Sequence, residues 1–167
     1  VVVSTVMANL GLEKALNRLL SARIQEGKAL ARDLLGRIRL IEKKLLEIER
    51  RARSLPREYY EKLRQRMREL LEDCVTEDKR VWQSAALLAE KADTTEEIVR
   101  LKSHLRLFRE RVAHQEEVGR ELDFLLQEMN REVNTVSAKA QDFGISKEVV
   151  FIKAELEKIR EQIQNIE

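Results

Sequence analysis

The chain has 167 residues, of which 43% are hydrophobic, 37% charged and only 4% aromatic. Five glycines and one proline leave few turns. This mixture predicts long helices and excludes a β-sandwich or a doubly wound sheet. The single cysteine excludes an internal disulfide and a cysteine-based zinc cluster, as is usual in a reducing cytoplasm. No apolar run approaches the ~20 residues of a membrane span.

The net charge of +2 hides an uneven distribution. Residues 1–75 carry 17 Lys and Arg against 11 Asp and Glu, whereas residues 76–167 carry 15 against 19. A basic half beside an acidic half is consistent with a polyanion path that leads to a cation-dependent site. Charge alone favours the simpler interpretation, which is ordinary scatter among helix surface charges.

Apolar residues from Leu20 to Leu55 recur at alternating spacings of four and three, which is a heptad seam held for five repeats. The pattern predicts a helix that begins near Leu12 and ends at Pro56, because proline disfavours helical geometry in the residue before it. Ser54 is the expected cap of the next helix. The opening VVVS is a candidate for the last strand of a preceding domain.

The rest of the chain predicts further helices separated by short turns. Three have expected limits at residues 57–73, 77–91 and 96–113. The next helix contains residues 119–135 and is followed by a loop at 141–144 and a last helix from about residue 146. Asp93, Thr94 and Thr95 form the expected turn and N-cap of the fourth helix. An apolar stripe from Ile145 to Ile166 indicates that the C-terminal end is packed.

Residues 119–135 are the densest run of unusual polar residues. Asp123, Gln127, Asn130 and Asn134 share one ridge of the predicted helix, and Glu128 and Glu132 lie one turn apart on another side. Asparagine is a mediocre helix former, so a ridge of this kind indicates a surface kept for binding. A solvated face with a few hydrogen bonds at an interface explains the pattern equally well.

Glu97, Arg100 and His104 lie on one ridge of the helix before it. Such a set can bind a metal, steer a phosphate or shuttle a proton. The alternative is that Glu97 caps the helix and His104 is partly buried and hydrogen-bonded. The presence of only one histidine in this set favours this structural interpretation. The loop at 114–118 is short, so the two helices should pack antiparallel with His104 facing residues 127–132. Glu132 is then the expected partner of Glu97 within one chain, and Asp123 acts across a subunit boundary.

The common catalytic signatures are absent from the sequence: it contains no P-loop, dinucleotide-binding glycines, HExxH or nucleophile elbow. The standard nucleic-acid modules are absent too. Three segments carry a more specific signal, and they are DTTEEIVRLKSHLRLF (93–108), GRELDFLLQEMNREVNTVSAKAQDFGIS (119–146) and IKAELEKIREQIQNIE (152–167). Together with Arg23, Glu26 and Gly27, they make residues 12–167 resemble the C-terminal region of the bacterial YicC/YloC family of endoribonucleases.

The resemblance implies a cytoplasmic, metal-dependent endoribonuclease of RNA turnover that assembles as a ring-like oligomer and carries a further N-terminal domain. The implied catalytic residues are Glu97, His104, Glu128 and Glu132. The implied ligands of Mn²⁺ or Mg²⁺ are Glu97, His104, Asp123 and Glu132. The implied RNA-binding residues are Arg23, Arg100, Arg120, Gln127, Asn130, Arg131, Asn134, Lys139 and Arg160. The sequence departs from the family at Ser84, where glutamate is expected, and at Thr94, where an apolar residue is expected.

We therefore expect an all-α fold: an elongated, oligomeric bundle of long antiparallel helices with heptad-like seams. The expected organisation is a remnant of a preceding domain or a linker at residues 1–11, a long helical hairpin at 12–92 and a C-terminal helical domain at 93–167. The expected function is metal-dependent cleavage of RNA. The alternative is a non-catalytic oligomerisation scaffold or an RNA-binding adaptor. Expected partners are RNA and other copies of the chain, such as in a hexamer, but neither membranes nor specific DNA sequences.

Overall fold

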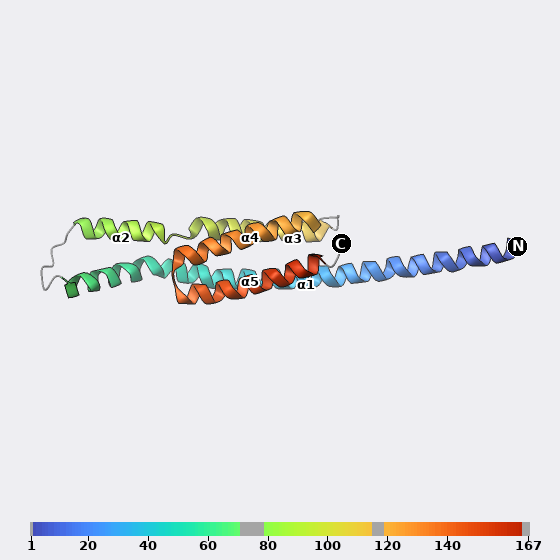
Figure 1. The fold of residues 1–167 in the computed structure, drawn as a ribbon, viewed down its shortest axis with the longest axis horizontal. Coiled ribbons are helices and arrows are strands. Elements are labelled where there is room, and N and C mark those ends of the chain that lie inside the picture. Colours follow the sequence, from blue (N-terminus) through green and yellow to red (C-terminus); the bar gives the residue numbers. More distant parts are fainter. Residues whose placement is uncertain (1, 71–78, 115–118, 165–167) are drawn as a thin grey trace. The chain divides into compact units, whose positions relative to one another are not determined.

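A computed structural model describes residues 2–70, 79–114 and 119–164 (Figure 1). The described residues form five helices and contain no strand, which confirms the all-α class. The helices are α1 (Val2–Leu70), α2 (Lys79–Lys91), α3 (Thr95–His114), α4 (Gly119–Ala140) and α5 (Phe143–Gln164). The chain divides into two compact units, residues 1–36 and residues 37–167.

The first unit is the N-terminal part of α1. Because α1 already begins at Val2, the strand proposed for the opening VVVS is wrong. The apolar β-branched run is a weak preference for strand that the surrounding helical sequence overrides. Large apolar side chains of this unit remain exposed, and they are Leu12, Leu16, Leu19, Leu20 and Ile24.

Pro56 lies inside α1, so the predicted helix end at this residue and the separate helix at 57–73 are both wrong; residues 71–73 lie outside the described part. Proline removes one backbone hydrogen bond, but side chains bridge the position. Ser54 Oγ donates to the carbonyl of Arg51 at 2.9 Å and lies 2.9 Å from Glu58 Oε1. Leu55 is buried. The expected cap Ser54 therefore supports a continuous helix instead.

In the second unit, residues 37–55 of α1 lie against both α5 and α3. Five ion pairs at 2.7–3.2 Å hold α1 in place. Two join it to α5, one to the residue before α5 and two to α3: Arg37–Glu155, Lys44–Glu148, Arg51–Asp142, Glu49–Lys102 and Glu42–Arg109. In both sets, rising residue numbers on α1 meet falling numbers on the partner. The segment of α1 therefore runs opposite to each of these helices.

The apolar core of this unit comes from the stripes that the heptad spacing predicts. Ile38, Ile41, Leu45 and Ile48 of α1 are almost fully buried. The stripes of the three later helices join them, namely Ile98, Leu101, Leu105, Phe108, Leu122, Leu125, Leu126, Met129, Val133, Val136, Ile145, Val149, Ile152, Leu156, Ile159 and Ile163. Burial on this scale is the main stabilising term of the fold.

A two-residue turn joins α4 to α5, and one backbone conformation and two hydrogen bonds fix it. Gln141 has a positive φ of 43°, which ends α4, and Asp142 Oδ1 accepts a hydrogen bond from the backbone of Ile145 at the start of α5. Tyr59 of α1 donates its hydroxyl to the carbonyl of Ala140 at 2.6 Å. The predicted loop at 141–144 is thus two residues shorter, because Asp142 caps a helix that begins at Phe143.

Within the described part of the chain, no helix is long and apolar enough to cross a membrane. The two helices that carry most of the candidate site residues, α3 and α4, lie side by side in the second unit (Figure 1).

The Arg51–Asp142 pair predicts acid-sensitive stability. Hydrogen bonds from Arg51 hold the pKa of Asp142 below its usual value, against the opposite effect of burial. A lowered folded-state pKa stabilises the folded chain above the unfolded pKa of about 3.9, and this contribution is lost as the pH falls through the folded value. Arg51→Gln should therefore lower stability at pH 7 and reduce its loss in acid, measured by urea unfolding between pH 7 and pH 2. Arg50→Gln, at an exposed neighbour, is the control; equal behaviour of the two variants would contradict the prediction.

Candidate functional site

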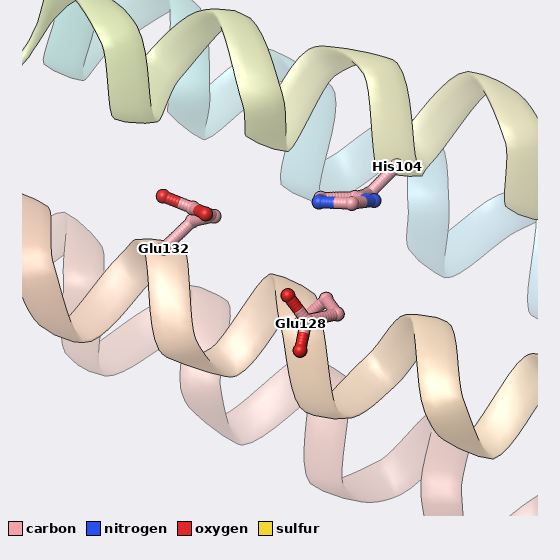
Figure 2. Close-up of side chains that lie close together, drawn as sticks. All are labelled: His104, Glu128 and Glu132. Carbon is pink, nitrogen blue, oxygen red and sulfur yellow. The ribbon is translucent and has the colours of Figure 1, made fainter.

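Three potential ligands meet between α3 and α4. His104 projects from α3 toward Glu128 and Glu132, which lie one turn apart on α4 (Figure 2). Each side chain offers one ligand atom, and these atoms all lie within 4.8 Å of one another. His104 and Glu128 are half-buried and Glu132 is buried. We call these three residues the His–Glu cluster.

The helix start and the core stripe place His104. Asp93 Oδ1 accepts hydrogen bonds from the backbone N–H and the hydroxyl of Thr95, so α3 begins where the sequence predicts. Leu101, about one turn before His104, and Leu105, the residue after it, are both buried. The imidazole therefore lies at the edge of the core stripe, partly shielded and partly open to solvent.

Glu132 differs from other buried glutamates of the chain in its charge compensation. Glu97 and Glu155 are buried to the same degree, but each has a lysine Nζ at hydrogen-bond distance: Lys139 at 2.7 Å and Lys158 at 2.6 Å. Burial raises the pKa of Glu155, but its pairs with Lys158 and Arg37 outweigh this effect, and the pKa is lowered.

The cation beside Glu132 is farther away and is shared. Arg100 Nη1 lies 3.7 Å from Glu132 Oε1, outside hydrogen-bond distance, and Nη2 of the same guanidinium donates to Glu96. The Arg100 side chain is 56% exposed, whereas that of Glu132 is 7% exposed. A buried carboxylate requires a compensating charge or proton. Glu132, with Glu128 one turn away, is therefore the most weakly neutralised of these three buried carboxylates.

The chemistry of the cluster follows from its donors. One imidazole nitrogen and two carboxylates can ligate a divalent cation that accepts mixed nitrogen and oxygen ligands. The same groups can accept and donate a proton, because imidazole and carboxylate are general acid–base groups. The arrangement of the three side chains is compatible with both cation binding and proton transfer.

The predicted residues fall into two groups. His104 faces Glu128 and Glu132, as the short loop between the helices predicts. Glu97 does not pair with Glu132 as expected: it binds Lys139, on the next turns of α4, and its Oε2 has no hydrogen-bond partner in the described part of the chain. Glu97 pairs with Lys139 because α3 and α4 run antiparallel and Lys139 is the residue of α4 that lies opposite Glu97.

Asp123 lies on another side of α4, away from the cluster. Its Oδ2 accepts a hydrogen bond from Gln127 at 2.7 Å, and its Oδ1 lies 3.4 Å from Arg160 Nε of α5, close enough for an ion pair but not in hydrogen-bond geometry. Asp123 therefore does not join His104 within this chain, and its role as a metal ligand stays a prediction.

The expected RNA-binding residues are distributed over both units. Arg100, Arg120, Gln127, Arg131 and Asn134 are exposed, and Asn130 is half-buried. Arg23 is exposed in the first unit. Lys139 was assigned to RNA, but its ammonium group neutralises Glu97, a role that sequence analysis missed. The available signal was its position seven residues after Glu132, on the side of α4 that faces α3.

Thr94, where the resemblance leads one to expect an apolar residue, is 2% exposed, and its hydroxyl has no hydrogen-bond partner among the described residues. Its surroundings thus suit an apolar side chain. Ser84, where glutamate is expected, is exposed on α2.

The His–Glu cluster lies in a part of the chain that matches a known protein family. Residues 48–167 match the sequence model described as "Endoribonuclease YicC-like, C-terminal". A relative from Clostridioides difficile (strain 630), named "Probable endoribonuclease YicC", is 46% identical over 162 residues, which are 96% of this chain and 55% of that protein. A relative of the same name from Haemophilus influenzae is 39% identical over 106 residues, 62% of this chain and 37% of that protein. The chain thus spans about half of the first relative and less of the second.

The Glu97–Lys139 pair generates a test of how α3 and α4 are held together. Lys139→Met should leave a buried carboxylate without its cation and lower the free energy of unfolding by about 2–3 kcal/mol, below the cost for a fully buried pair because Lys139 is itself part-exposed. Adding Glu97→Gln should recover part of the loss in a double-mutant cycle. Lys147→Met, at an exposed site on α5, is the matched control, and an equal effect there would count against the pair.

Proposed function

The chain belongs to the YicC-like endoribonuclease family through its C-terminal region, and from this we propose that it contributes to metal-dependent hydrolysis of RNA at the His–Glu cluster. The single observation that carries the proposal is the weakly neutralised buried Glu132 beside His104 and Glu128. A buried carboxylate of this kind favours a cationic ligand. The names of both relatives, probable endoribonucleases, support RNA as the substrate.

The donor set suits Mn²⁺ better than Mg²⁺, because Mg²⁺ prefers oxygen ligands in strict octahedral geometry. Glu128, Glu132 and His104 would hold the cation, which when bound supplies an activated water and screens the phosphate charge. Arg100, exposed at the rim, is placed to bind a phosphate oxygen and stabilise developing charge.

Charge-neutral substitutions test this assignment. Glu132→Gln and Glu128→Gln should each lower Mn²⁺-dependent cleavage of an RNA oligonucleotide by about 100-fold or more, because they remove a ligand or a proton acceptor. RNA binding measured with EDTA should persist. Glu157→Gln, an exposed glutamate of α5, is the control. Cleavage at the wild-type rate by both cluster variants would place the reaction elsewhere.

Glu97→Gln distinguishes the two roles that this residue now has. Catalysis or metal binding by Glu97, as the family resemblance implies, predicts lost cleavage in a stably folded variant. A purely structural pair with Lys139 predicts lower thermal stability with cleavage retained below the melting temperature. Measuring both quantities on the same preparation separates the roles.

A second role as a self-associating scaffold has its own support in the first unit. Leu12, Leu16, Leu19, Leu20 and Ile24 form an exposed stripe along one side of the helix, each at least 50% exposed. An exposed apolar stripe of this length is typical of a helix that packs against another chain. The expected occupant is a second copy of the same segment.

Sedimentation velocity tests self-association. The wild-type chain should sediment as an oligomer at micromolar concentration, and Leu16→Lys should shift it to a smaller species, because a charge in the middle of the stripe opposes burial. Ser21→Lys introduces the same side chain on the opposite side of the helix and should leave the oligomer unchanged. A wild-type monomer, well folded by circular dichroism, would rule out the scaffold role.

A further inference from the structure

Phe124 is a large apolar residue of α4 that the core does not use. Its side chain is 60% exposed, whereas Leu122, Leu125 and Leu126 around it are at most 4% exposed. A phenylalanine on the solvent side of a helix loses the benefit of burial. Its sequence neighbourhood offers no apolar stripe that it extends, because the residues one turn before and after it are Arg120 and Glu128.

The position of Phe124 relative to the His–Glu cluster follows from helix geometry. Phe124, Glu128 and Glu132 are spaced by four residues, so they lie on successive turns of one side of α4, about 6 Å apart. Figure 2 shows Glu128 and Glu132 with His104 at this side of the helix. The aromatic ring is therefore one turn from the nearest member of the cluster and open to solvent.

Two guanidinium groups accompany the ring. Arg120 lies one turn before Phe124, and Arg131 lies two turns after it and next to Glu128 and Glu132 in the helix. Both arginines are exposed. An exposed aromatic ring between cations is the combination that binds single-stranded nucleic acid, with stacking of a base on the ring and contacts of phosphates to the arginines.

We propose that Phe124 is a stacking platform for an unpaired RNA base next to the phosphate held at the His–Glu cluster, with Arg120 and Arg131 on the flanking phosphates. The inference rests on the proposed function and adds to it a residue that contacts a base of the RNA. A base in a duplex is already stacked and paired, so it cannot lie on the ring. Stacking on a ring is tolerant of base identity, so the platform selects strandedness rather than sequence.

Cations on both sides favour a polyanion over a second protein chain as the occupant. A protein partner for this face would need acidic groups placed opposite both Arg120 and Arg131, whereas any RNA strand supplies phosphates on each side of a base. Phe124 is placed beside the cluster rather than within it. It is therefore a positioning residue, and its effect should appear in binding as well as in cleavage.

The test uses the whole chain, a single-stranded RNA with one 2-aminopurine, a matched duplex, and EDTA to prevent cleavage. Phe124→Ala should weaken binding of the single strand about 5- to 150-fold, the range found when one stacked base loses its aromatic partner, and should abolish quenching of the 2-aminopurine. Phe124→Leu, which keeps apolar bulk, should behave like alanine, and Phe124→Trp should retain quenching. Duplex binding should be unchanged in all three variants.

Phe143→Ala is the matched control, because Phe143 is an even more exposed phenylalanine on α5, and it should bind and quench as the wild type does. Equal binding of single strand by Phe124→Ala, Phe124→Leu and Phe143→Ala would overturn the platform, while Mn²⁺-dependent cleavage by the wild type would leave the proposed function standing. If quenching depends on Phe124 but the wild-type chain cuts no RNA, the platform would stand and the proposed function would fail. A changed sedimentation coefficient in Phe124→Ala, with RNA binding intact, would assign this face to a second copy and overturn the platform.

Discussion

Burial of a carboxylate is the constraint on which the second unit depends. Removing an ionised carboxylate from water costs several kcal/mol unless a cation or a proton compensates it. Glu97 meets this requirement with Lys139 of α4, and Glu155 meets it with Lys158 of its own helix and Arg37 of α1. The pairs with Lys139 and Arg37 each join two helices. Glu132 meets it only through a distant and shared arginine. The same physical requirement that stabilises the fold at two positions therefore leaves a third position suited to binding a ligand.

The apolar spacing of the sequence was sufficient to predict much of the fold. Stripes at spacings of three and four predicted α3, α4 and α5 and nearly all of their buried residues, because periodicity reports the buried face directly. Pro56 shows the limit of such reasoning. Its effect on a helix is local, but the contacts of Ser54 and Arg51 that carry α1 past it involve Asp142, 86 positions away from Pro56 along the chain. The spacing of apolar residues cannot predict contacts between side chains so far apart in the chain.

The candidate site was predictable to about one helical turn. A short loop between two helices requires antiparallel packing, and this was enough to place His104 opposite Glu128 and Glu132. It was not enough to decide whether Glu97 would meet Glu132 or Lys139, since these residues lie two turns apart on nearly the same side of α4. Phe124 carried no signal of its own in the sequence, because one apolar residue outside the periodic stripe predicts neither burial nor binding.

The Glu97–Lys139 pair also determines how far α4 can slide along α3. Leucine and valine stripes alone tolerate a shift by one turn, because a new apolar residue replaces the old one at each contact. A shift of four residues would bring Thr135 opposite Glu97 in place of Lys139, and the buried carboxylate would lose its cation. The pair therefore fixes the axial alignment of the two helices, because a shift by one turn would break it. Because His104, Glu128 and Glu132 come together only in that alignment, Lys139, two turns from Glu132, also keeps these three side chains close to one another.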